Sequence, residues 1–289
     1  MRPIGTLGTV ILTAVISLSL GGGSGDVEGG PSARDPSRAP TDLPARSRVP
    51  PGFQQRAETD VRGPAAFHEF YFTRGMYSDY SRGFYRGSRW RIDYPKADIQ
   101  FLIGLKRLTN IDAFDRENAV ALDDPNLRRF PFLYILEVGY MNLSDAEVQG
   151  LRDYLLAGGF LVVDDFWGTY EWRTFESQMR RVLPDRPIID IPLDHPVFNV
   201  FYNIDSLVQV PNVSQGRAAP FGGPTHEQDG FVPKVKGVVD DHGRLMVLIN
   251  WNTDLGDAWE WADDPYYPLR FSTFAYEMGI NFIIYAMTN

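Results

Sequence analysis

The pattern of apolar and polar residues is most regular between residues 130 and 170. An unbroken apolar and aromatic run at 132–136 is typical of a strand that is buried on both faces. Residues 148–155 then carry apolar side chains at spacings of three and four, the period of a helix. A second apolar run follows at 160–163. The pattern predicts a strand, a helix and a second strand within about thirty residues.

Capping residues mark both ends of the predicted helix. Ser144 and Glu147 have the spacing of a capping box. Gly158 and Gly159 end the helix, because glycine takes the left-handed C-cap conformation without a Cβ clash. A crossover of this kind makes the two strands parallel. We therefore predict an α/β fold, a three-layer sandwich with a mostly parallel sheet, in which segments 132–138 and 160–163 are neighbours.

Other patterned segments add elements around this unit. A first strand is predicted at 67–72, and residues 73–77 are predicted to be the loop that leaves it. Residues 214–231 have the Gly and Pro content of a polar loop. Further strands are predicted at 119–122, 188–191, 201–210, 235–239 and 245–249, and further helices at 94–108, 171–183 and 273–287.

The composition divides the 289 residues into a folded part and an N-terminal extension. Residues 66–289 are predicted to form a single α/β domain. Residues 26–65 are rich in Pro, Gly, Ser and Arg and poor in large apolar residues, so they are predicted to be a disordered linker. Arg2 and the apolar run at 10–20 predict that residues 1–25 are a signal peptide or an uncleaved N-terminal anchor. We expect an exported protein, periplasmic or otherwise extracytoplasmic.

Charge and cysteine content exclude several classes of function. The net charge of −9 and the lack of a basic stripe argue against a nucleic-acid partner. The absence of cysteine excludes disulfides, a thiolate nucleophile and a cysteine zinc site. The acidic residues at 254–264 lack the spacing of an EF-hand, so they are expected to form a solvated loop. We expect no metal ligand and no cofactor.

Polar residues follow three of the predicted strands at the point where each apolar run stops. Parallel strands place their carboxyl ends on one side of the sheet, where open α/β sheets bind ligands. Arg74 is expected to supply a cation, Asp164 an acceptor or base, and Trp167 a stacking wall. The alternative is that these side chains cap helices and brace loops without a ligand. The candidate ligand-binding residues are Arg74, Tyr77, Asp164, Asp165, Trp167, Asn250, Asn252 and Asp254.

Two functions stay open. The first is a non-catalytic domain that binds a small molecule, a carbohydrate or a protein partner. The second is a hydrolase acting on carbohydrate or a related polymer, with Asp164 or Asp165 paired with Glu137 or Glu171 as acid and base. Because adjacent strand residues point to opposite faces, Asp164 and Asp165 are not expected to serve the same site. No catalytic residue is assigned.

Several motifs resemble those of the bacterial domain of unknown function 4159 family. The resemblance is carried by FTRGMY at 72–77, the DYP motif at 93–95, GGFLVVDDFWG at 158–168, NTDLGDAWE at 252–260 and EMGINFIIYAMT at 277–288. This family implies no established activity.

The central stretch is also similar, more distantly, to the class I glutamine amidotransferase-like fold of trehalose-utilisation-type proteins. This resemblance implies a flavodoxin-like sheet. In the amidotransferases the strand after the paired glycines ends in a nucleophilic cysteine, and Asp164 stands at the nearest position here. The resemblance therefore supports the fold and excludes amidotransfer by that mechanism.

Overall fold

The computed structural model describes residues 68–80 and 88–289. The predicted signal or anchor segment and the predicted linker lie outside these residues. Seven strands form a single sheet. The strands are β1 (Thr73–Met76), β2 (Asn118–Ala121), β3 (Phe132–Leu136), β4 (Phe160–Asp164), β5 (Ile189–Asp190), β6 (Lys234–Val239) and β7 (Leu245–Trp251).

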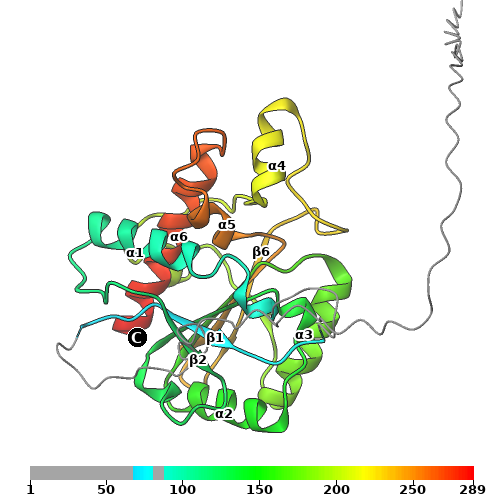
Figure 1. The fold of residues 1–289 in the computed structure, drawn as a ribbon. Helices are drawn as coiled ribbons and strands as arrows, with labels where there is room; N and C mark the ends of the chain where they lie inside the picture. Colours follow the sequence, from blue (N-terminus) through cyan, green and yellow to red (C-terminus); the bar gives the residue numbers. More distant parts are fainter. Residues whose placement is uncertain (1–67, 81–87) are drawn as a thin grey trace, which may run out of the picture. The chain divides into compact units, whose positions relative to one another are not determined.

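The sheet has the strand order β2-β1-β3-β4-β7-β6-β5 (Figure 1). The first five strands in this order, from β2 to β7, are parallel to one another. Strand β6 is antiparallel to both β7 and β5. If the five parallel strands alone are numbered along the chain, their order is 2-1-3-4-5. This is the order of flavodoxin-like doubly wound sheets, which bind ligands outside the carboxyl ends of their strands.

Helices cover both faces of the sheet and give the predicted three-layer α/β architecture. One hydrophobic core lies under α1, α5 and α6, and the other lies under α2 and α3 (Figure 1). Among the described residues, no helix has both the length and the apolar character needed to cross a bilayer. The helices are α1 (Lys96–Leu108), α2 (Asp145–Leu156), α3 (Gly168–Val182), α4 (Val213–Ala218), α5 (Leu255–Glu260) and α6 (Leu269–Thr288), with 3-10 turns at Arg89–Arg91, Leu127–Arg129, Val138–Tyr140, Pro196–Phe198 and Ala219–Phe221.

The central strand–helix–strand unit is confirmed. Strands β3 and β4 are parallel neighbours, in register from Phe132 opposite Phe160 to Leu136 opposite Asp164. The Ser144 hydroxyl accepts from the backbone N–H of Glu147, and the Glu147 carboxylate accepts from the backbone N–H of Ser144. The apolar spacing and the capping box therefore fix this helix locally.

Three of the predicted segments are wrong. Strand β1 begins at Thr73, so Arg74 lies inside a buried strand and not in the loop after it. A buried strand can hold this arginine because Asp98 of α1 neutralises it. Residues 201–210 form no strand, and their buried side chains Ile204 and Val210 pack on the core from irregular backbone. The predicted polar loop at 214–231 overlaps α4 and a 3-10 turn.

We expect Ser144→Ala to lower the free energy of unfolding by about 1 kcal/mol, since it removes the side-chain half of the capping box. Chemical denaturation followed by circular dichroism measures the change. Ser177→Ala is the matched control, because Ser177 is exposed on α3 and its replacement should change stability by less than about 0.5 kcal/mol. Equal effects of the two substitutions would contradict the role of the capping box.

Candidate functional site

The chain leaves three neighbouring strands through a residue with a left-handed backbone. Glu137 follows β3 with φ 55°, Asp165 follows β4 with φ 47°, and Asn252 follows β7 with φ 64°. Asp93, just before α1, has φ 60°. Residues other than glycine rarely adopt this conformation, and those that keep it cluster at binding and catalytic sites. The strained residues mark the carboxyl end of the sheet as the candidate site.

Five carboxyl groups meet at this end of the sheet. Oxygen atoms of Asp93, Asp165 and Asp254 all lie within 4.8 Å of one another. Oxygen atoms of Asp93, Asp257 and Glu260 form a second group within the same limit, so Asp93 belongs to both groups. The side of the cluster with Asp165 and Asp254 is closed, since these residues are only 9% and 3% exposed. Glu260 is partly exposed, and Asp93 is partly exposed as a residue although its Oδ2 atom is buried.

Within the described residues, the negative charge of this cluster is not balanced by an ion pair, although the charges of Arg74 and Lys96 lower the pKa values of Asp93, Asp257 and Glu260. Among the described residues, no lysine, arginine or histidine forms an ion pair with any of the five carboxylates. Burial, and after it the neighbouring carboxylates, raises the pKa of Asp93, Asp165 and Asp254 well above the usual range. Unpaired buried charges are costly. Protons or a bound cation would remove this cost.

Asp164 joins the sheet to this cluster. Its Oδ2 atom accepts from the Tyr134 hydroxyl at 2.6 Å and from the backbone N–H groups of Leu255 and Gly256 at 2.8 and 3.1 Å. These bonds fix the start of α5. Burial raises the Asp164 pKa to about 7, although all of these hydrogen bonds lower it.

The structure brings the Asp164 and Asp165 carboxylates closer together than the strand alternation predicts, although only Asp165 belongs to the cluster. After burial, both carboxylates contribute to the raised pKa of Asp254, so both lie near the same cluster. The left-handed backbone of Asp165 explains this, because it ends the regular strand geometry and with it the alternation of side chains.

Several buried polar atoms at this end of the sheet lack a hydrogen-bond partner. Asn250 is 1% exposed, and neither atom of its amide has a partner among the described residues. Oδ1 of Asp164 and Oδ2 of Asp93 also lack one. A Cβ at Gly256 would lie 2.7 Å from this Asp93 oxygen and 3.2 Å from the Tyr134 hydroxyl, so glycine is needed for the close approach. Unsatisfied buried acceptors of this kind call for a ligand, a proton or water.

Arg74 lies within β1 and is fully buried. Its Nε and Nη2 atoms donate to the Asp98 carboxylate, and Nη1 donates to the backbone carbonyl of Ile92 at 3.2 Å. Its guanidinium carbon lies 4.9 Å from the centre of the Tyr134 ring. The donors that could bind a ligand are thus already engaged, and the described contacts favour a structural role.

Two other predicted ligand residues, Tyr77 and Asn252, hold loops together. Tyr77 donates its hydroxyl to the backbone carbonyl of Leu136 at 2.7 Å. Asn252 accepts from the N–H of Gly168 at 2.9 Å and donates to the carbonyl of Val232 at 2.8 Å.

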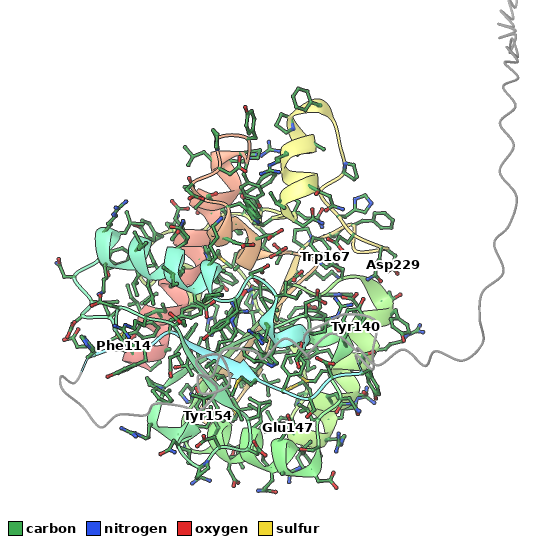
Figure 2. The ribbon with its side chains drawn as sticks, viewed as in Figure 1. Phe114, Tyr140, Glu147, Tyr154, Trp167 and Asp229 are labelled. Carbon is green, nitrogen blue, oxygen red and sulfur yellow. The ribbon has the colours of Figure 1, made fainter. Side chains whose placement is uncertain are left out.

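Trp167 is only 2% exposed and donates its indole N–H to Asp165, so it cannot form an open stacking wall. Figure 2 shows it on the side of the molecule where the chain after α4 approaches the start of α3, close to Asp229. Asp229 accepts there from both the backbone N–H and the hydroxyl of Thr169.

The two glutamates of the predicted acid/base pairs differ in surroundings. Glu137 forms an ion pair with Arg89 at 3.1 Å, and burial raises its pKa to about 7. The backbone N–H of Glu137 donates to the carbonyl of Asp165 at 2.9 Å. Glu171 accepts from the backbone N–H of Trp167 and from the Gln228 amide, so it braces the start of α3. Of the two, Glu137 is the one held beside the carboxylate cluster.

The sequence missed three members of the cluster. Asp257 and Glu260 were expected in a solvated acidic loop, but Asp254 caps the short helix α5 and buries Asp257 with it. The prediction of a solvated loop is therefore wrong. Composition alone could not distinguish the two cases, because a solvated loop and a short helix with an N-cap can have the same polar composition. Asp93 follows no strand, and only the DYP motif at 93–95 could have pointed to it. The segment 81–87, which contains Arg82 and Arg86, lies outside the described residues.

We expect Asp98→Asn to lower the free energy of unfolding by about 3–5 kcal/mol, because it leaves the buried Arg74 guanidinium without a counter-charge. The double substitution Arg74→Met with Asp98→Leu should cost much less. Asp115→Asn is the matched control, since Asp115 pairs with Lys106 on the surface and such pairs contribute about 0–1 kcal/mol. A mild effect of Asp98→Asn would show that Arg74 is free to serve a ligand.

The chain matches the model of one protein family over most of its length. Residues 80–287 match the family model described as "Domain of unknown function (DUF4159)". No curated protein matches the chain. The likeness to the class I glutamine amidotransferase-like fold stays a prediction from the central motif. Since the family match spans most of the chain, including every carboxylate of the cluster, the chain belongs to the DUF4159 family.

Proposed function

We propose that this domain binds a divalent cation through Asp93, Asp165 and Asp254 at the carboxyl end of the sheet. The observation that carries the proposal is the convergence of three carboxylates within 4.8 Å, none of which forms an ion pair among the described residues. Calcium and magnesium are hard cations that take carboxylate and carbonyl oxygen ligands. A bound cation would neutralise the charge that burial makes costly.

The unpartnered polar atoms support a cation over a network of shared protons. Protons would let the carboxyl groups bond to one another, yet Oδ2 of Asp93 and Oδ1 of Asp164 have no partner. Val163 of β4 pairs with Ile249 of β7, so the next residues of the two strands, Asp164 and Asn250, are neighbours. Neither atom of the Asn250 amide has a hydrogen-bond partner among the described residues. Both atoms of this amide are therefore available to water or to a ligand near the cation.

The cation would serve as the centre of a ligand-binding domain. It would join the residue before α1, the end of β4 and the start of α5, three segments that are far apart in the sequence. Its remaining coordination positions would face the side of Asp93 and Glu260, which are partly exposed. A carboxylate or hydroxyl group of a small molecule or carbohydrate can occupy such positions.

We also propose that the domain acts after export. This rests on the pattern of residues 1–25, a positive start followed by a short apolar run. Calcium modules outside the cytoplasm bind with dissociation constants of about 10⁻⁴–10⁻³ M, so a calcium site of that affinity suits this location. A reporter fused after residue 66 should be active only on the extracytoplasmic side.

We expect metal-free protein to gain about 2.7 kcal/mol of stability when the cation is present at 100 times its dissociation constant. For a domain of this size the melting temperature should rise by about 5–10 °C. Calorimetry after EDTA treatment, with calcium, magnesium or manganese added back, measures both the shift and the stoichiometry. If none of the three ions raises the melting temperature, the proposal is wrong.

We expect Asp254→Asn and Asp165→Asn to abolish the shift, because each removes one charged ligand and keeps its shape. Asp194→Asn, at an exposed aspartate far along the chain from these residues, is the matched control and should leave the shift intact. Glu260→Gln tests the second group, to which Asp165 and Asp254 do not belong. If Asp165→Asn stabilises the protein and cations have no effect, the cluster is a network of protonated carboxyl groups.

Hydrolysis of carbohydrate or a related polymer is a second candidate, favoured by the position of Glu137. Its ion pair with Arg89 holds the carboxyl at the end of β3, and its backbone is bonded to Asp165 at the end of β4. A positioned carboxyl beside a cation site can transfer protons in hydrolysis. Glu137→Gln should then abolish release of reducing ends from polysaccharides while cation binding persists. Wild-type protein that is inactive on a polysaccharide panel would remove this candidate.

A further inference from the structure

A groove with a volume of about 830 Å³ lies beside the second hydrophobic core, away from the carboxylate cluster. It is lined by helix α3, the turn at 183–188, strand β6 and the end of strand β7. Ligand sites commonly have volumes of about 300–1,000 Å³. The residues that carry the argument are two indoles and four basic side chains, Trp172, Trp251, Lys234, Lys236, Arg180 and Arg186.

The two indoles form one aromatic surface in this groove. The rings of Trp172 and Trp251 are 4.6 Å apart between centroids and inclined at 41°. Both residues are partly exposed. The ammonium group of Lys236 lies 5.6 Å from the Trp172 ring centre, and that of Lys234 lies 5.7 Å from the Trp251 ring centre. These separations are close to the limit of about 6 Å for a cation–π contact, so the lysines are held only weakly.

The groove gathers four basic side chains in a chain whose net charge is −9. It has four basic side chains and only two acidic ones, Glu176 and Asp185. Three of the basic side chains are paired at the surface. Arg180 pairs with Glu176 one helical turn away, and Lys236 and Arg186 pair with Asp190 and Asp241, whose side chains are 76% and 82% exposed. Exposed pairs of this kind contribute about 0–1 kcal/mol, so a ligand can displace them.

Lys234 differs from the other basic residues of the groove. It is exposed and forms no ion pair within the part of the chain that the structure describes. It lies opposite Trp251 in the pairing of β6 with β7. An ammonium group without an ion pair among the described residues thus lies beside an indole, a combination that suits a ring carrying a negative charge.

We propose that this groove binds an acidic oligosaccharide built of uronic acids. The apolar face of a pyranose ring would pack on the indoles, since an indole offers a large, rigid apolar surface. The carboxylates would receive charge-assisted hydrogen bonds from Lys234 and from Arg180 or Arg186. This site is independent of the proposed cation site, because no residue belongs to both.

The direct test is titration with hexamers of galacturonate, glucuronate and mannuronate, followed by tryptophan fluorescence and calorimetry. EDTA is present throughout, so that a cation cannot bridge the carboxylates to the acidic cluster. We expect binding of at least one hexamer, weakening with salt, and no binding of the neutral hexamer of galactose. Failure of all three uronate hexamers to bind would overturn the proposal and leave the cation site unaffected.

Variants then locate the binding. Lys234→Glu should weaken it by about tenfold or more, the loss of one charge-assisted hydrogen bond. Trp251→Phe should weaken it less than Trp251→Ala. Lys106→Glu is the matched control, since it makes the same charge change on α1 and should leave affinity unchanged. Equal losses for Lys234→Glu and Lys106→Glu, or equally tight binding of poly-glutamate, would overturn the assignment to an acidic saccharide.

Discussion

Buried negative charge must be neutralised, and this requirement shapes the carboxyl end of the sheet. Parallel strands β3, β4 and β7 end side by side, so the residues that follow them come together. Asp165 and Asp254 are supplied in this way, and Asp93 joins them from the segment before α1. Burial, and after it the neighbouring carboxylates, raises the pKa values of these three aspartates. A bound cation would offset this cost and would hold the three distant segments together.

The same requirement is met differently a short distance away. Arg74 and Asp98 neutralise each other inside the core, and the backbone carbonyl of Ile92 completes the donors of the guanidinium. The Tyr134 ring packs under Arg74, and its hydroxyl donates to Asp164. Asp164 in turn fixes the start of α5, which carries Asp257. The buried pair of Arg74 and Asp98 is thus linked through Tyr134 and Asp164 to the helix that carries part of the carboxylate cluster.

This arrangement separates two kinds of polar residue at one end of the sheet. The first kind forms hydrogen bonds with neighbouring backbone and side chains and so gives the loops a fixed shape; it comprises Tyr77, Trp167 and Asn252. Asp93 of the cluster, by contrast, has a buried oxygen without a hydrogen-bond partner, and so does Asp164 beside it. Such rigid support around an unsatisfied group is what a binding site requires, because a ligand then meets groups that are already in place.

The sequence by itself determined the architecture. The apolar runs at 132–136 and 160–163, with the Ser144 capping box between them, are local signals, and local signals predict a parallel pair. It also placed Asp164, Asp165 and Asp254 at strand ends. Only the tertiary structure decided that Arg74 is paired with Asp98 and that Asp93 completes the cluster. Both facts depend on contacts with α1 and α5, whose positions follow from packing and not from any spacing along the chain.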